Sequence, residues 1–127
     1  DVHMQLAIVP TAKNDTLLAL VTTLHMPAAD SHISFFDTAW RPVAKAPFAM
    51  PGYDEWLSPE GLTGRDDVLT ELPFMPVSAA FDAEGLVLML TNEAPAYLDK
   101  SRTDSIAAKI IPSKVYDIKD GKFLPRQ

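Results

Sequence analysis

The stretch Thr16 to Met26, with the sequence TLLALVTTLHM, decides the fold because both of its faces are apolar when it is read with the two-residue period of a β-strand. One face carries Leu18, Leu20, Leu24 and Met26, and the other carries Leu17, Ala19 and Val21. A β-branched run at 21–23 and turn-forming clusters at 13–15 and 27–31 favour a strand over a buried helix. The pattern predicts a central strand that needs cover on both faces.

Further strands are predicted on either side of this stretch, because the other apolar segments also end at turn-forming residues. They are residues 4–9, 32–36, 40–43, 74–81, 86–91, 114–118 and 122–124. The segments 82–85 and 120–121 predict two hairpin turns, since each ends in a glycine that can adopt positive φ. The segment 40–43 contains Pro42, which limits it, and is predicted as a short edge strand.

Residues 44–73 are a connection rich in proline and glycine, with short helices predicted at 53–57 and 66–72. A longer helix is predicted from Arg102 to Ile111, immediately before a proline. These elements predict a single α+β domain over residues 1–127. We expect a twisted, mostly antiparallel sheet of about six to eight strands in meanders and hairpins, with the main helix on one face.

Composition limits the classes of function. The 127 residues are 47% hydrophobic, which is enough for one packed core, and 17 acidic against 11 basic residues give a net charge of -6. Nucleic acid is therefore not expected as a partner, because phosphate binding needs a concentrated basic surface. No apolar run approaches the roughly 18 residues of a membrane-spanning helix. The absence of cysteine leaves the redox compartment open.

The start of the sequence suggests that more polypeptide precedes it. There is no initiator methionine, and no charged leader comes before the first apolar segment. We therefore expect an upstream segment in the full-length protein. Because the predicted helices are too few to cover both faces of the sheet, we expect this segment or a partner chain, such as a second copy, to provide the rest of the cover.

Three segments carry a resemblance to a known family. They are VPTAKNDTLLALVTTLHMPAADSHISFFDTAW at 9–40, LPFMPVSAAFD at 72–82 and LMLTN at 88–92. The chain resembles an uncharacterised family of secreted or periplasmic proteins of Gram-negative anaerobes, domain-of-unknown-function family 3256. The resemblance implies that this chain is the C-terminal two-thirds of such a protein, with a signal peptide and a helical segment upstream. It carries over no catalytic or binding residue.

A metal site is one candidate for function. His25 and His32 flank one predicted turn with Asp30 between them, so two imidazoles and a carboxylate could meet at the end of a hairpin. The alternative is that these are solvated side chains at an ordinary turn, and the sequence offers no second pair of ligands. We therefore predict no metal site, and keep the three residues as weak candidates.

A hydrolase with two catalytic carboxylates is a second candidate. Acidic side chains are available at Asp54, Glu55, Asp66, Asp67, Glu71, Asp82 and Glu84. Spacing along the chain does not place two of them several ångströms apart, as glycoside hydrolysis requires, and helix starts and turns also account for them. There is no Gly-x-Ser-x-Gly nucleophile elbow and no glycine-rich phosphate loop, so no cofactor is predicted.

An aromatic cluster is the third candidate. Trp40, Phe48, Tyr53 and Trp56 lie around the proline-rich connection, where exposed rings could stack on sugars or anchor a partner. The alternative is that these rings hold the loop onto the sheet. We take Trp40, Tyr53 and Trp56 as the candidate ligand-binding residues.

The function expected from the sequence is a non-enzymatic extracytoplasmic module that binds a ligand or an unidentified protein or glycan partner. The competing hypothesis is a glycan-directed hydrolase that uses a pair of carboxylates. A shallow apolar surface favours the binding module, whereas a pocket with two carboxylates about 5 to 10 Å apart favours the hydrolase.

Overall fold

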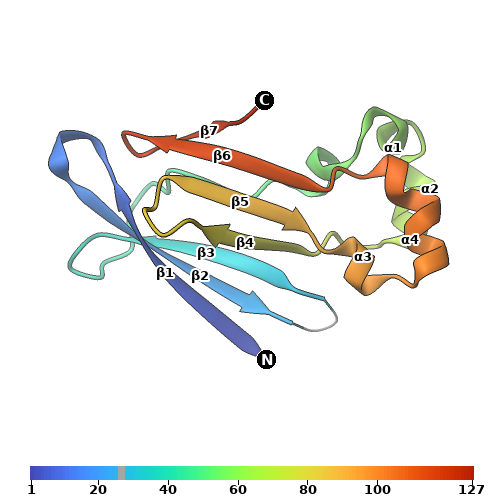
Figure 1. The fold of residues 1–127 in the computed structure, drawn as a ribbon, viewed down its shortest axis with the longest axis horizontal. Coiled ribbons are helices and arrows are strands. Elements are labelled where there is room, and N and C mark those ends of the chain that lie inside the picture. Colours follow the sequence, from blue (N-terminus) through green and yellow to red (C-terminus); the bar gives the residue numbers. More distant parts are fainter. Residues whose placement is uncertain (26–27) are drawn as a thin grey trace.

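The computed structural model describes residues 1–25 and 28–127, and within them seven strands form two antiparallel sheets (Figure 1). The first sheet is the meander β1 (Val2–Pro10), β2 (Thr16–Leu24) and β3 (Asp30–Phe36). The second contains β4 (Val77–Phe81), β5 (Val87–Asn92), β6 (Ser113–Lys119) and β7 (Lys122–Pro125) in chain order. Met26 and the turn residue Pro27, which the sequence placed at the end of the central strand, lie outside the described residues.

The central strand predicted at Thr16 is confirmed as β2, which pairs with β1 on one side and β3 on the other. The β1–β2 connection includes the 3-10 turn Ala12–Asn14. The two predicted hairpin turns are also confirmed, because Gly85 has φ 69° between β4 and β5, and Gly121 has φ 77° between β6 and β7. Both glycines therefore lie in the left-handed region that favours a residue without a side chain.

The prediction of one continuous sheet is wrong, because the ladder is interrupted between β3 and β4. The long connection between these strands brings β4 alongside the first sheet without backbone pairing. Side chains of the first sheet bind the free edge of β4 instead. Asp30 accepts a hydrogen bond from the Val77 amide at 3.1 Å, and Ser31 accepts one from the Ala79 amide at 2.9 Å.

The core lies between the inner faces of the two sheets. On the first sheet these faces carry Ala7, Val9, Ala19, Val21 and Phe35, and on the second they carry Val77, Ala79, Phe81, Leu88, Leu90 and Ile118. Each set follows the two-residue alternation of its strands. Burial of these side chains is the main force that holds the two sheets together.

The connection after β3 covers the part of the second sheet that the first sheet leaves open. The Phe48 ring stacks on Phe123 at 5.1 Å between ring centroids and meets Tyr116 edge-on at 4.9 Å. The edge strand predicted at 40–43 is reduced to an isolated antiparallel bridge between Phe36 and Pro42. Backbone hydrogen bonds flank the bridge, from the Asp37 amide to the Arg41 carbonyl at 2.9 Å and from the Val43 amide to the Phe35 carbonyl at 3.2 Å. A proline at this position has no amide proton to continue a ladder.

The helices gather at one end of the sheets and do not cross a face, which corrects the predicted arrangement (Figure 1). In the described residues they are the 3-10 helix Tyr53–Trp56, α1 (Pro59–Thr63), α2 (Arg65–Glu71), α3 (Ala94–Tyr97), α4 (Lys100–Ile106) and the 3-10 helix Ala107–Lys109. The helix predicted from Arg102 to Ile111 is therefore divided and shorter. It starts where the Asp99 side chain accepts a hydrogen bond from the Arg102 amide, and Ile110 is already extended and bridged to Leu57.

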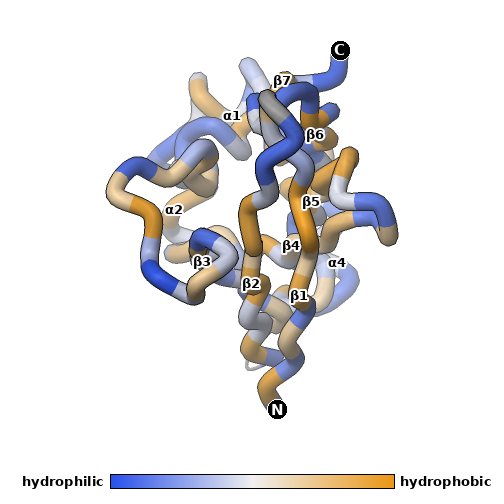
Figure 2. The backbone as a smooth tube through the Cα atoms, turned by 90° about the vertical axis from the view of Figure 1, so that its left-hand side faces the viewer, coloured by the Kyte–Doolittle hydropathy of each residue, from blue (hydrophilic) through white to orange (hydrophobic). Residues whose placement is uncertain are grey.

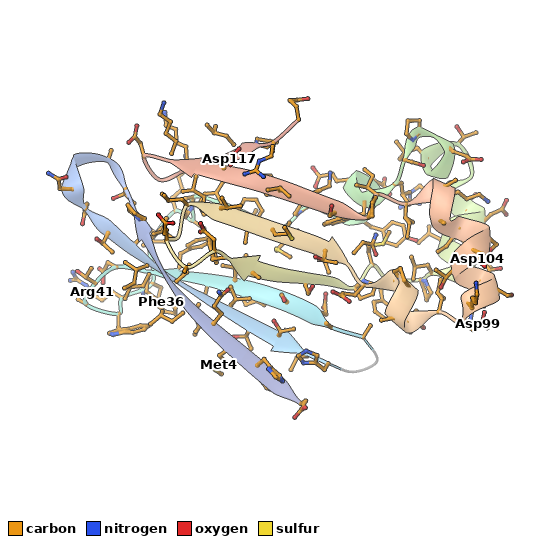
Figure 3. All side chains as sticks on the ribbon, in the orientation of Figure 1. Met4, Phe36, Arg41, Asp99, Asp104 and Asp117 are labelled. Carbon is orange, nitrogen blue, oxygen red and sulfur yellow. The ribbon has the colours of Figure 1, made fainter. Side chains whose placement is uncertain are left out.

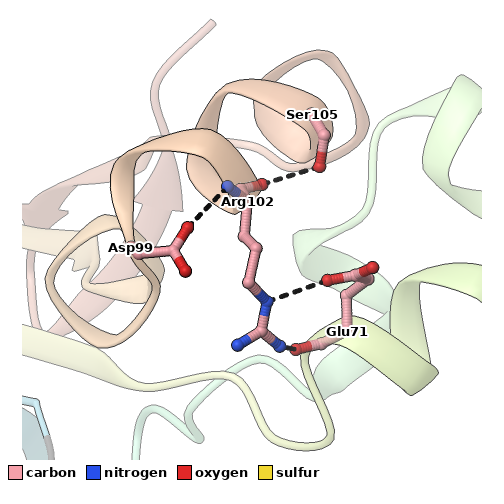
Figure 4. A network of polar contacts seen from close by, with 4 residues as sticks. All are labelled: Glu71, Asp99, Arg102 and Ser105. Atoms are coloured by element: carbon pink, nitrogen blue, oxygen red, sulfur yellow. Dashed lines mark hydrogen bonds and ion pairs between the residues drawn. The ribbon is translucent and has the colours of Figure 1, made fainter.

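The helical end has its own small core and a polar link between helices. Buried apolar residues there are Leu57, Val68, Leu72, Ala94, Leu98, Ile106 and Ile110. Arg102 on α4 binds both the carboxylate of Glu71 on α2, at 3.0 Å, and the Glu71 carbonyl oxygen, at 2.8 Å (Figure 4). One guanidinium thus holds the ends of two helices together.

Candidate interaction surface

The outer face of the first sheet is apolar and open to solvent. On β1, Val2, Met4, Leu6 and Ile8 alternate with inward-facing residues and are between 50% and 69% exposed. A large apolar side chain that is exposed singly is normal, but four in a row on one strand are not. Figure 3 labels Met4 on this strand, and Figure 2 shows the hydrophobic stretches of β1 and β2 on the side that faces the viewer.

The apolar surface continues across the sheet through residues that lie directly opposite one another. Ile8 pairs with Leu18, which pairs with Phe36, and Leu6 pairs with Leu20. Opposite residues in an antiparallel ladder project from the same face. We call this surface the outer strip, defined as Val2, Met4, Leu6, Ile8, Leu18, Leu20, Leu24 and Phe36.

Trp40 extends the outer strip beyond β3. Its ring lies 5.7 Å from the Phe36 ring, and the residue is 55% exposed. Its backbone has φ 62°, an uncommon conformation for a bulky residue. Such backbone strain persists only where the surroundings impose it.

Asp37 imposes this conformation on the Trp40 loop. One carboxylate oxygen accepts hydrogen bonds from the amides of Ala39 at 2.9 Å and Arg41 at 3.0 Å, and the other binds the Arg41 guanidinium at 3.0 Å. The hydrogen bond from the Arg41 amide is the largest cause of the lowered pKa of Asp37. The loop is therefore fixed before any partner arrives.

The outer face of the second sheet is different, because polar groups interrupt it. Ser78 donates to the Glu93 carboxylate at 2.6 Å, and Asp117 binds Arg126 through two hydrogen bonds that lower the pKa of Asp117. Met89, at 49% exposed, and Leu124, at 46%, are large apolar residues on that face, and Leu124 lies opposite Asp117. The outer face of the first sheet has polar residues, among them Thr22, His32 and Ser34, on β2 and β3, and its apolar row along β1 is unbroken.

The structure does not bring the three predicted aromatic residues into one exposed surface. Trp56 is 1% exposed and belongs to the core between the sheets, where the Lys114 ammonium lies 5.4 Å from its ring centroid. Tyr53 is half-buried and donates a hydrogen bond to the Leu72 carbonyl. Trp56 therefore holds the connection onto the sheet, which was the alternative interpretation, and Trp40 alone of the three is exposed.

The three candidate metal ligands, His25, Asp30 and His32, each contact a different part of the structure. The His25 ring meets His3 edge-on at 4.5 Å, and Asp30 binds the Val77 amide. His32 lies opposite Thr22 on the outer face. Within residues 1–25 and 28–127, no group of three histidine, cysteine or acidic side chains is placed to hold a metal ion.

Several of the candidate carboxylates have structural partners. Asp54 binds Arg65 at 2.6 Å, Glu71 binds Arg102, and Asp82 accepts hydrogen bonds from two amides of its turn. A hollow of about 220 Å³ contains Asp66 and Asp67, but these are neighbours in the first turn of α2. Another hollow, of about 360 Å³, lies beside β6 and the C-terminus and includes Lys114, Tyr116 and Arg126.

The outer strip was not identified from the sequence as a candidate site, although the alternation of residues on β1 could have indicated it. Val2, Met4, Leu6 and Ile8 alternate with the residues that turn inward, but the first strand was predicted only as a short apolar run from Met4 to Val9. The alternation alone does not say which face is buried, since Ala7 and Val9 are also apolar.

The fold and the surface define a class: an α+β domain of two packed antiparallel sheets, one of which has an exposed apolar outer face. The chain belongs to the family described as protein of unknown function (DUF3256), whose family model matches residues 1–123. No curated protein matches the chain. In the part of the chain that the structure describes, no helix is long and apolar enough to cross a membrane.

A solved structure shares the fold. It is the structure of a domain of an uncharacterized protein from Porphyromonas gingivalis W83, with a TM-score of 0.81 and 20% sequence identity. The similarity covers 97% of this chain and 65% of that chain. This chain therefore spans slightly less than two-thirds of the length of the solved one.

Proposed function

We propose that this protein is a non-catalytic interaction module that binds a protein partner through the outer strip and Trp40. The observation that carries the proposal is the row of exposed apolar residues on β1, Val2, Met4, Leu6 and Ile8. Contiguous apolar surface of this kind on a folded domain is typical of a binding site, because leaving it in water is unfavourable.

The chemistry of the surface favours a protein over a glycan. Sugars are bound by convergent hydrogen-bonding groups together with a stacked ring. Around the exposed Trp40, the neighbouring ring is Phe36, and the strip continues through Leu18 and Ile8. These side chains offer area to bury but no hydrogen bonds to hydroxyl groups, and the polar side chains in the Trp40 loop, Asp37 and Arg41, are bonded to each other.

A periplasmic or secreted location is part of this proposal. Its support is the resemblance of residues 9–40, 72–82 and 88–92 to secreted and periplasmic proteins. An apolar interaction surface is compatible with either location, so the location rests on the resemblance alone.

An uncharged apolar dye tests whether the outer strip binds. Nile red fluorescence is expected to rise when the dilute wild-type chain is added. The rise should be smaller with the Leu20→Lys and Ile8→Lys variants, because each places a charge within the outer strip. Met89→Lys is the matched control, because it places the same charge on the central region of the second sheet. Dye binding that is absent, or that is equal in all four proteins, would overturn the proposed function.

A further inference from the structure

We propose that the occupant of the outer strip is a second copy of this chain, and that two copies pack face to face through their first sheets. This inference rests on the proposed function and names the partner. The argument has three parts, which concern the area of the strip, its charge and its edge.

The exposed area fits a small stable dimer. Val2, Met4, Leu6, Ile8, Leu24 and Trp40 are each at least half exposed. At 150–250 Å² for a large side chain, their exposed surface is on the order of 600 Å² per chain. Two copies would together bury on the order of 1,200 Å², which is the lower end of the range for specific interfaces.

The shape of the strip is also suitable. Strands of nine residues with a rise of about 3.3 Å per residue give a surface about 30 Å long, and three strands give it a width of about 15 Å. Two such surfaces can interdigitate as stacked sheets do, with their strands about 30° apart. The inner faces of this molecule already pack two sheets in this general manner.

The charge distribution favours a self-complementary contact. The chain has a net charge of -6, so two copies repel one another through most of their surface. Between Val2 and Pro10 there is no acidic or basic residue other than His3, whose side chain faces inward, and β2 has none between Thr16 and Leu24. The ionisable residues of this sheet's outer face are on β3, where Asp30 lies opposite Leu24 and His32 lies opposite Thr22, so the surface along β1 and β2 is uncharged. A two-fold axis brings identical surfaces together, and an uncharged apolar surface is the kind that does not repel its own copy.

The edges of the two sheets distinguish a face-to-face dimer from an edge-to-edge one. The edge of β4 is closed by side chains, and β7 is a four-residue strand that begins at Lys122 and ends at Pro125. β1 is a longer edge strand without such protection along residues 2–8, so its backbone could also pair with a second β1. Edge pairing would leave the outer strip uncovered, and it is therefore the competing arrangement that the experiment must separate.

Sedimentation equilibrium of the full 127-residue chain tests the proposal, over about 1 to 500 µM to bracket weak dissociation constants. The wild-type chain is expected to be a dimer in the upper part of this range. Leu20→Lys and Ile8→Lys are expected to weaken dimerisation at least 30-fold, whereas Met89→Lys should leave it within about threefold. Circular dichroism and the midpoint of thermal unfolding establish that each variant is folded.

Leu20 is informative because it lies on the central strand β2 and not on the edge. Its replacement disrupts face-to-face packing but leaves the β1 backbone free to pair. A dimer that survives Leu20→Lys would overturn the face-to-face proposal, and so would a wild-type chain that is monomeric throughout. If that monomer still binds Nile red through the strip, the proposed function survives and only the choice of partner fails; if it binds no dye, both fail.

Discussion

The side-chain amide of Gln5 binds the backbone of Phe81 through both of its ends. The Gln5 oxygen accepts a hydrogen bond from the Phe81 amide at 2.9 Å, and the Gln5 nitrogen donates to the Phe81 carbonyl at 2.9 Å. These two residues are 76 positions apart in the sequence. The amide group thus takes the place of a neighbouring peptide group at the edge of β4, where no strand pairs.

Replacing Gln5 by alanine is expected to lower the free energy of unfolding by about 1–3 kcal/mol, because the Phe81 N–H and C=O both lose their partner in a partly buried position. Chemical denaturation measures this change, and hydrogen exchange at the Phe81 amide locates it. Gln5→Glu has nearly the same volume but turns an oxygen toward the Phe81 carbonyl, so it should be equally destabilising. Gln127→Ala, at the exposed C-terminus, is the control and should have no effect; an unchanged stability in Gln5→Ala would contradict the role of this contact.

Trp56 and Trp40 are expected to respond oppositely to truncation. Trp56→Ala should lower the free energy of unfolding by about 3–5 kcal/mol, because it leaves a cavity in the core between the sheets. Trp40→Ala should change it by less than about 1 kcal/mol, since the ring is 55% exposed. Urea denaturation at low protein concentration compares the two, and similar losses in both variants would show that Trp40 belongs to the core.

Gly61 packs α1 against the 3-10 helix at Lys109 more closely than any side chain allows. A Cβ atom at Gly61 would lie 2.0 Å from the Lys109 carbonyl oxygen. We expect Gly61→Ala to lower the free energy of unfolding by about 1–3 kcal/mol, although alanine is the better helix former. At Gly52 a Cβ atom would meet nothing within 4 Å, so Gly52→Ala is the control. Equal stability of the two variants in thermal unfolding would disprove the close contact.

Local signals in the sequence were sufficient for the individual strands and tight turns. The two apolar faces of 16–26 predicted a strand, which is present as β2 over Thr16–Leu24, and the glycines at 85 and 121 predicted the turns that their positive φ values confirm. A strand and a hairpin turn depend on neighbouring residues, so the pattern and the structure agree.

The division into two sheets could not be predicted, because it depends on contacts between distant residues. Nothing near Gln5 indicates that its amide will bind Phe81, and nothing near Asp30 indicates that it will bind Val77. The same limit applies to the aromatic cluster. Trp40 and Trp56 each have a proline within three positions, yet one is exposed and the other is buried in the core between the two sheets.

Protonation of Asp37 is expected to release the Trp40 loop. Hydrogen bonds, first of all from the Arg41 amide, lower the pKa of Asp37 below its ordinary value of 3.8 in the folded state. The carboxylate therefore stabilises the loop fully above pH 3.8, and this contribution is lost as the pH falls through the lowered pKa. Acrylamide quenching of tryptophan fluorescence should increase over that acidic range, because Trp40 leaves its left-handed conformation while Trp56 stays buried.

In Asp37→Asn the increase should be absent, since the side chain no longer titrates. Asp117→Asn is the matched control, because Asp117 also has a lowered pKa but is paired with Arg126 on the other sheet, and it should keep the wild-type response. Far-UV circular dichroism must remain constant over the same range, and a quenching change that persists in Asp37→Asn would assign it to another group.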